Sequence, residues 1–216
     1  MTTIKFCGIT LPADAEFAVE LGASHVGVIF AESPRRVSEI TAKKVLELAD
    51  SRVKHVGVFG RSSPAAVAGT ANLLKLDVVQ IHRAVDGAFM SRLKGGYGGQ
   101  VWLVVGVDDA PTAIADARER AQFADAILLD TSVAGRTGGT GKPFAWESIA
   151  DVFAREPIGI PIIIAGGLNP NNVGEAIRLL RPAVVDVSSG VETRPGIKDH
   201  NLMRSFAEAV HSASIV

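Results

Sequence analysis

The chain has 216 residues, of which 47% are hydrophobic, so it can bury a substantial core in one larger domain or two small ones. A formal net charge of −1 and an aromatic content of 6% argue against nucleic acid or a membrane surface as a partner. A single cysteine excludes an intrachain disulfide and a cysteine-rich metal site, and without a signal-peptide pattern or a bilayer-spanning run we expect a cytoplasmic protein.

Short apolar runs recur along the chain, and most of them are followed by a helical pattern. The first, at residues 4–10, alternates so that Lys5 and Cys7 share one face of a strand and Ile4 and Phe6 share the other. The other runs that we interpret as strands are 25–30, 53–59, 76–82, 101–105, 124–130, 160–165 and 183–188. Most are rich in Val, Ile or Leu, which is typical of strands buried on both faces.

Helices are expected between these strands, several of them with recognisable starts. Thr10 predicts a capping hydroxyl ahead of a proline in the first turn. Ser63-Pro64 and Asn169-Pro170 each predict an N-cap followed by proline at the first helical position. Asp199 precedes a fourth apolar helical face. Alternating strands and helices predict a parallel sheet.

Eight strand–helix units favour a closed (β/α)8 barrel, although 216 residues is short for one. A doubly wound open sheet is the alternative, and it would often show a G-x-G-x-x-G fingerprint after the first strand. Here Gly8 is followed by Ile9 and Thr10 instead. We therefore predict an α/β fold, a single (β/α)8 TIM barrel with a parallel eight-stranded sheet, formed by residues 1–216 as one domain.

In a barrel, polar residues at the carboxyl ends of the strands converge on one mouth, where such enzymes keep their chemistry. This sequence places six there: Cys7, Gln80, His82, Asp130, Asp186 and Ser188. A carboxylate inside an apolar strand is costly to bury unless it is paired, which favours a role for Asp186. The five histidines lack metal-ligand spacing with acids or Cys7, so we expect no metal and no cofactor.

Glycines after the last two strands indicate an anion site. Gly166 and Gly167 lie between a strand and a helix start, and Ser189 and Gly190 follow the final strand. Loops at these two positions hold phosphate in many barrels. The Gly-rich segment 131–143 is typical of a mobile cover over a substrate. Arg35, after the second strand, is a candidate partner for a carboxylate.

These motifs together resemble the phosphoribosylanthranilate isomerase family of tryptophan biosynthesis. The resemblance rests on Lys5-Phe6-Cys7-Gly8-Ile9-Thr10, Ser33-Pro34-Arg35, Val56-Gly57-Val58-Phe59, Val79-Gln80-Ile81-His82, Leu128-Leu129-Asp130-Thr131, Gly138-Gly139-Thr140-Gly141-Lys142, Gly166-Gly167-Leu168-Asn169-Pro170 and Asp186-Val187-Ser188-Ser189-Gly190-Val191-Glu192. They span nearly the whole chain. Arg83, Leu103 and Ala165 depart from the usual pattern of the family.

The resemblance implies an isomerase that carries out the Amadori rearrangement of N-(5-phosphoribosyl)anthranilate, a phosphorylated amino-sugar. It makes Asp130 the general acid that opens the sugar ring and Cys7 the general base that removes the C2 proton. It further implies that Arg35 binds substrate and that Gly166, Gly167, Ser189 and Gly190 bind phosphate. Asp186 is then expected near the anthranilate group, and Gln80 and His82 near the sugar.

Two other functions remain open at this level. One is a related aminoaldose-phosphate isomerase, although such barrels commonly carry aspartate at the position of Cys7. The other is a non-catalytic barrel that binds a phosphorylated metabolite, which would keep the glycine loops without needing Cys7 opposite Asp130.

Overall fold

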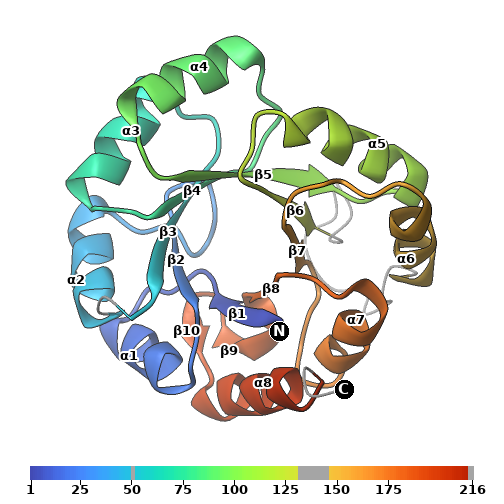
Figure 1. Ribbon diagram of the computed structural model, residues 1–216. Coiled ribbons are helices and arrows are strands. Elements are labelled where there is room, and N and C mark those ends of the chain that lie inside the picture. The colour runs from blue at the N-terminus through green and yellow to red at the C-terminus, as the bar shows by residue number, and fades with distance from the viewer. Residues whose placement is uncertain (50–51, 131–145, 214–216) are drawn as a thin grey trace.

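The computed structural model describes residues 1–49, 52–130 and 146–213. Within them, eight parallel strands close into a barrel in the order β1 to β8, with β1 pairing to both β2 and β8. Figure 1 shows the helices arranged around this ring of strands. The strands are β1 (Thr3–Phe6), β2 (His25–Ile29), β3 (Lys54–Phe59), β4 (Val78–Ile81), β5 (Gln100–Gly106), β6 (Ala126–Asp130), β7 (Ile162–Ala165) and β8 (Val184–Val187). The predicted (β/α)8 barrel is therefore confirmed.

The helices follow their strands as expected. They are α1 (Pro12–Glu20), α2 (Glu39–Ala49), α3 (Pro64–Leu73), α4 (Gly87–Gly96), α5 (Ala110–Ala121), α6 (Trp146–Arg155), α7 (Val173–Leu180) and α8 (His200–Ala213). Between β8 and α8 lie a short 3₁₀ helix, η1 (Ser189–Val191), and an antiparallel hairpin of β9 (Glu192–Arg194) and β10 (Ile197–Lys198). The sequence patterns did not predict this hairpin.

Two of the expected helix starts differ from the structure. The N-cap of α1 is Leu11, which makes no side-chain cap bond, and not the predicted Thr10. The Thr10 hydroxyl donates instead to the carbonyl of Gly196, 2.5 Å away. Helix α7 begins at Val173, and Asn169 instead accepts a hydrogen bond from the Asn171 amide in a turn. Ser63 does cap α3, as predicted, by accepting from Ala66.

Strand alternation divides the apolar residues into two cores. Residues such as Ile4 and Phe6 pack outward against the helices. A smaller cluster, which includes Trp102, Leu128 and Val184, fills the barrel interior. Leu103, one of the departures from the family pattern, belongs to the outer core and so faces the helices, not the mouth.

Candidate active site

Lys5 of β1 and Cys7, which directly follows this strand, point the same way into the barrel, as the alternation predicted. Lys5 is fully buried, and its ammonium donates to Asp186 Oδ2 at 2.6 Å and to Gln80 Oε1 at 3.0 Å. These three residues come from β1, β8 and β4, so their contacts cross the interior of the barrel. Gln80 and Asp186 are themselves buried, so with Lys5 they form a layer of buried polar side chains below the mouth.

The space for Cys7 and Lys5 depends on a glycine in the neighbouring strand. A Cβ atom at Gly27 of β2 would lie 3.0 Å from Cys7 Sγ and 3.2 Å from Lys5 Cε. Glycine in a strand interior often marks such a close approach. Sequence reasoning missed Gly27, although a glycine inside the apolar run of β2 is the signal that could have revealed it.

Inside the barrel, the positive charge of Lys5 is paired with the carboxylate of Asp186. Burial would lower the pKa of Lys5, but the Asp186 carboxylate outweighs it, so the pKa of Lys5 is raised and the ammonium stays charged. Burial raises the pKa of the Cys7 thiol, and Lys5 partly offsets that effect. Burial likewise raises the pKa of Asp186. Asp186 Oδ1 is buried and has no hydrogen-bond partner among the described residues, so it can accept one from a ligand.

Asp130 ends β6 on the same interior face as Ala126 and Leu128. In the closed barrel β6 is separated from β1 by β7 and β8, so Asp130 and Cys7 approach the mouth from different sides. His82 Nε2 lies 3.5 Å from Asp130 Oδ2. Hydrogen bonding to Asp130 raises the pKa of His82, against the opposing effect of burial. The two side chains therefore form a hydrogen-bonded pair at the rim.

The two glycine loops meet, as their adjacent strands predicted. Gly166 and Gly167 have φ angles of 87° and 67°, a region that favours glycine. A Cβ atom at Gly190 would lie 1.8 Å from the carbonyl oxygen of Leu168, so only glycine allows this contact. Ser189 and Gly167 are exposed at this junction. The junction thus brings the two glycine-containing loops, the candidate anion site, into direct contact.

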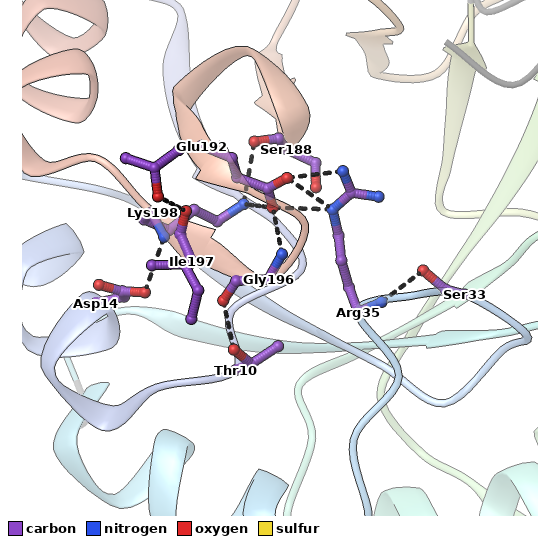
Figure 2. A network of polar contacts seen from close by, with 10 residues as sticks. Thr10, Asp14, Ser33, Arg35, Ser188, Glu192, Gly196, Ile197 and Lys198 are labelled. Carbon is purple, nitrogen blue, oxygen red and sulfur yellow. Dashed lines mark hydrogen bonds and ion pairs between the residues drawn. The ribbon is translucent and has the colours of Figure 1, made fainter.

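Arg35 is engaged by Glu192, a residue that the sequence patterns included in a motif without assigning it a role. The guanidinium donates from Nε to Glu192 Oε1 at 2.8 Å and from Nη2 to Oε2 at 2.7 Å (Figure 2). Lys198, which no sequence pattern singled out, donates to Glu192 Oε1 at 2.8 Å.

The predicted cover, residues 131–143, lies outside the described residues. No group of three or more His, Cys, Asp or Glu side chains in the described ranges could hold a metal ion.

The closed barrel places polar residues at the carboxyl ends of its strands, where (β/α)8-barrel enzymes have their active sites. The fold and the site therefore define the class of the protein as a (β/α)8-barrel enzyme. Residues 4–209 match the family model of N-(5'-phosphoribosyl)anthranilate (PRA) isomerase. The chain belongs to the N-(5'-phosphoribosyl)anthranilate isomerase family. No helix among the described residues has the length and apolar character needed to cross a membrane.

Relatives and solved structures agree with this assignment. The N-(5'-phosphoribosyl)anthranilate isomerase of Acidithiobacillus ferrooxidans is 40% identical over 97% of this chain and 98% of the relative. That of Thermoanaerobacter sp. is 38% identical, with the same coverage. The crystal structure of phosphoribosyl anthranilate isomerase from Thermotoga maritima superposes with a TM-score of 0.88 at 35% identity, covering 98% of this chain and all of the other.

A further structure of phosphoribosyl anthranilate isomerase contains reduced 1-(o-carboxyphenylamino)-1-deoxyribulose 5-phosphate. It superposes with a TM-score of 0.84 at 33% identity, and covers 98% of this chain and 100% of the other. That protein therefore binds a small phosphorylated molecule bearing a carboxyphenylamino group.

Proposed function

We propose that this chain converts N-(5-phosphoribosyl)anthranilate to 1-(2-carboxyphenylamino)-1-deoxyribulose 5-phosphate in tryptophan biosynthesis, with Asp130 as general acid and Cys7 as general base. The protein is an aldose–ketose isomerase by its family. The residue assignment follows the family resemblance, and the observation that supports it is that Cys7 directly follows β1 and Asp130 ends β6 at one barrel mouth. The amino-acid composition supports a cytoplasmic, single-domain chain that binds no nucleic acid or membrane.

The first step needs a proton on the furanose ring oxygen. Asp130 gives its proton to that oxygen, the C1–O bond breaks, and the nitrogen lone pair forms a protonated Schiff base. His82, 3.5 Å from Asp130, is the neighbouring group that resupplies the proton. In the free protein a charged His82 favours an ionised Asp130. When substrate displaces water from the mouth, burial disfavours both charges, so the proton moves from His82 to Asp130 and leaves a neutral imidazole.

The second step removes the C2 proton. The Cys7 thiolate takes this proton, the C2 electron pair neutralises the Schiff base, and the enolamine formed tautomerises to the ketose. Burial raises the pKa of Cys7, so the thiolate is a minor species in the free protein. The positive Schiff base beside it, together with Lys5, favours the thiolate when it is needed.

Substrate contacts follow from the same surfaces. Arg35 binds the anthranilate carboxylate, and the junction of Gly166, Gly167, Ser189 and Gly190 binds the phosphate. Asp186 Oδ1, buried without a described partner, accepts a hydrogen bond from the anthranilate amine. Gln80 and His82 then lie nearest the sugar.

The test is turnover of N-(5-phosphoribosyl)anthranilate, followed by its fluorescence, in wild type, Cys7→Ser and Asp130→Asn. General acid and base groups each contribute about 10²–10⁴-fold, so each variant should lose at least about 10²-fold in kcat while keeping its circular dichroism spectrum. Because Cys7 is the chain's one cysteine, alkylation reports on it alone, and a product analogue should protect it. Full activity in either folded variant would overturn its role, and an inactive wild type would overturn the function.

A further inference from the structure

Beside the mouth lies a buried charge cluster, defined here as Arg35, Glu192 and Lys198 (Figure 2). Besides the three bonds from Arg35, Glu192 accepts from Lys198 Nζ at 2.8 Å and from the Gly196 amide at 3.3 Å. Lys198 also donates to the carbonyl of Ser188 at 3.0 Å. The Glu192 and Lys198 side chains are 3% and 0% exposed, whereas Arg35 is 18% exposed. The cluster thus opens to solvent at its arginine end.

Charge in this cluster is tightly coupled. Burial alone would raise the pKa of Glu192, but hydrogen bonds from Arg35 and Lys198 hold it below its ordinary value. Glu192 therefore stays ionised at neutral pH. Burial lowers the pKa of Lys198, against the opposing effect of Glu192. Two basic side chains thus face one carboxylate, and only the arginine end is open to an incoming anion.

The geometry leaves a defined part of Arg35 available. A guanidinium has five N–H donors in a rigid fork. Glu192 takes the edge formed by Nε and Nη2. Among the described residues, Nη1 of Arg35 has no hydrogen-bond acceptor. The second edge, Nη1 with the remaining Nη2 hydrogen, can still bind a carboxylate through two parallel hydrogen bonds.

The stem of Arg35 fixes where that second edge lies. A Cβ atom at Gly8 would lie 2.6 Å from Arg35 Cδ and 2.9 Å from Ser188 Oγ, so the arginine crosses directly over Gly8. Gly8 immediately follows Cys7. The stem of Arg35 therefore crosses the chain directly after Cys7, the residue proposed as the base.

The hairpin that carries Glu192 and Lys198 is anchored independently of any ligand. The Lys198 amide donates to Asp14 Oδ2 of α1 at 3.3 Å, and Thr10 bonds the carbonyl of Gly196. Asp14 is itself buried and contacts His200 Nε2 at 2.9 Å. Contacts to the β1–α1 loop, α1 and α8 thus hold Glu192 in place before substrate arrives.

We propose that Glu192 is a positioning residue that sets specificity for a substrate carboxylate. It holds Arg35 by one edge so that the other meets the carboxylate of the aryl amine, while Lys198 compensates the charge of Glu192. This inference rests on the proposed function, since it takes Arg35 as the carboxylate-binding residue. It adds that recognition depends on a buried acid that never touches the substrate.

The experiment compares two substrates, N-(5-phosphoribosyl)anthranilate and the N-(5-phosphoribosyl)aniline that lacks the carboxylate. Misplacement of a positioning group by about 1 Å costs up to about 10²-fold. Glu192→Gln should therefore raise KM for the anthranilate substrate about tenfold or more, with a smaller change in kcat. Turnover of the aniline substrate should not change. Glu156→Gln, which disrupts the exposed Arg118–Glu156 pair between α5 and α6, is the matched control and should change neither.

Equal loss on both substrates would assign Glu192 a structural role, and no loss on either would also overturn the proposal. Glu192→Asp keeps the charge with a shorter reach, and it serves if Glu192→Gln does not fold; its loss should again be confined to the anthranilate substrate. Affinity for reduced 1-(o-carboxyphenylamino)-1-deoxyribulose 5-phosphate, with and without the carboxyl group, separates the two proposals. Wild type that binds both forms equally would overturn this inference, whereas an inactive wild type that prefers the carboxylate would overturn only the catalytic function.

Discussion

Gly8 permits a direct test of how backbone geometry and side-chain contact combine at the mouth. Its φ of +69° lies in the left-handed region, where a residue with a Cβ costs about 1–2 kcal/mol. Gly22, just after α1, has a φ of +76°, but a Cβ atom added there would meet no atom within 4 Å among the described residues. Gly22→Ala therefore measures the backbone cost alone.

Gly8→Ala adds a steric cost. The new methyl group would lie 2.6 Å from Arg35 Cδ, about 1 Å inside an ordinary carbon–carbon contact. Overpacking of this kind costs about 1–3 kcal/mol, so we expect a total loss of about 2–5 kcal/mol. Because Arg35 must shift to accommodate the methyl group, its bonds to Glu192 should be disturbed, and KM for the anthranilate substrate should also rise.

Urea denaturation followed by circular dichroism gives the two free energies of unfolding, and steady-state kinetics gives KM. Gly22→Ala should lose about 1–2 kcal/mol with unchanged KM. Equal destabilisation of the two variants, with KM unchanged in Gly8→Ala, would refute the claim that Arg35 is held against Gly8.

Two further predictions concern buried charge. Lys5→Met leaves Asp186 unpaired inside the barrel, so the free energy of unfolding, measured by urea denaturation, should fall by about 3–5 kcal/mol. Because Lys5 lowers the pKa of Cys7, its loss should also move the rising limb of the kcat/KM–pH profile to higher pH. An unmoved limb would show that Lys5 does not favour the Cys7 thiolate. Burial lowers the pKa of His25 to about 3 in the folded protein, whereas in the unfolded chain this pKa is 6.5. Below pH 6.5 the unfolded chain therefore binds a proton that the folded protein does not, and stability is lost as the pH falls. Between pH 7.5 and 5 this loss is about 2 kcal/mol; it should vanish in His25→Gln and persist in the control His211→Gln on an exposed part of α8.

Local patterns predicted the elements that depend on nearby residues. The period-two alternation of β1 placed Lys5 and Cys7 on the interior face, and Ser63 capped its helix, because both effects act within a few residues. Thr10 and Asn169 were wrong as caps because competing partners, Gly196 from the far end of the chain and Asn171 in a local turn, engaged their side chains.

The cluster around Glu192 was beyond such patterns. Lys198 and Asp14 are 184 residues apart, and their contact exists only because the hairpin folds back over α1. Composition gave no sign that the side chain of Lys198, in the two-residue strand β10, is fully buried. The roles proposed for Cys7 and Asp130 came from the family resemblance, since position alone does not show which polar residue at a mouth transfers a proton.

The pairing of the first strand with the last has a consequence for synthesis of the protein. Lys5 emerges from the ribosome near the start of translation, yet its ion-pair partner Asp186 is 181 residues later. Until β8 has been made, the edge of β1 is unpaired and Lys5 has no counter-ion from that strand. Contacts this distant along the chain form slowly, because the whole intervening loop must be ordered first. A growing chain therefore carries the Cys7 thiol long before the closed barrel that buries it exists, and the thiol is enclosed only when the last strand pairs with the first.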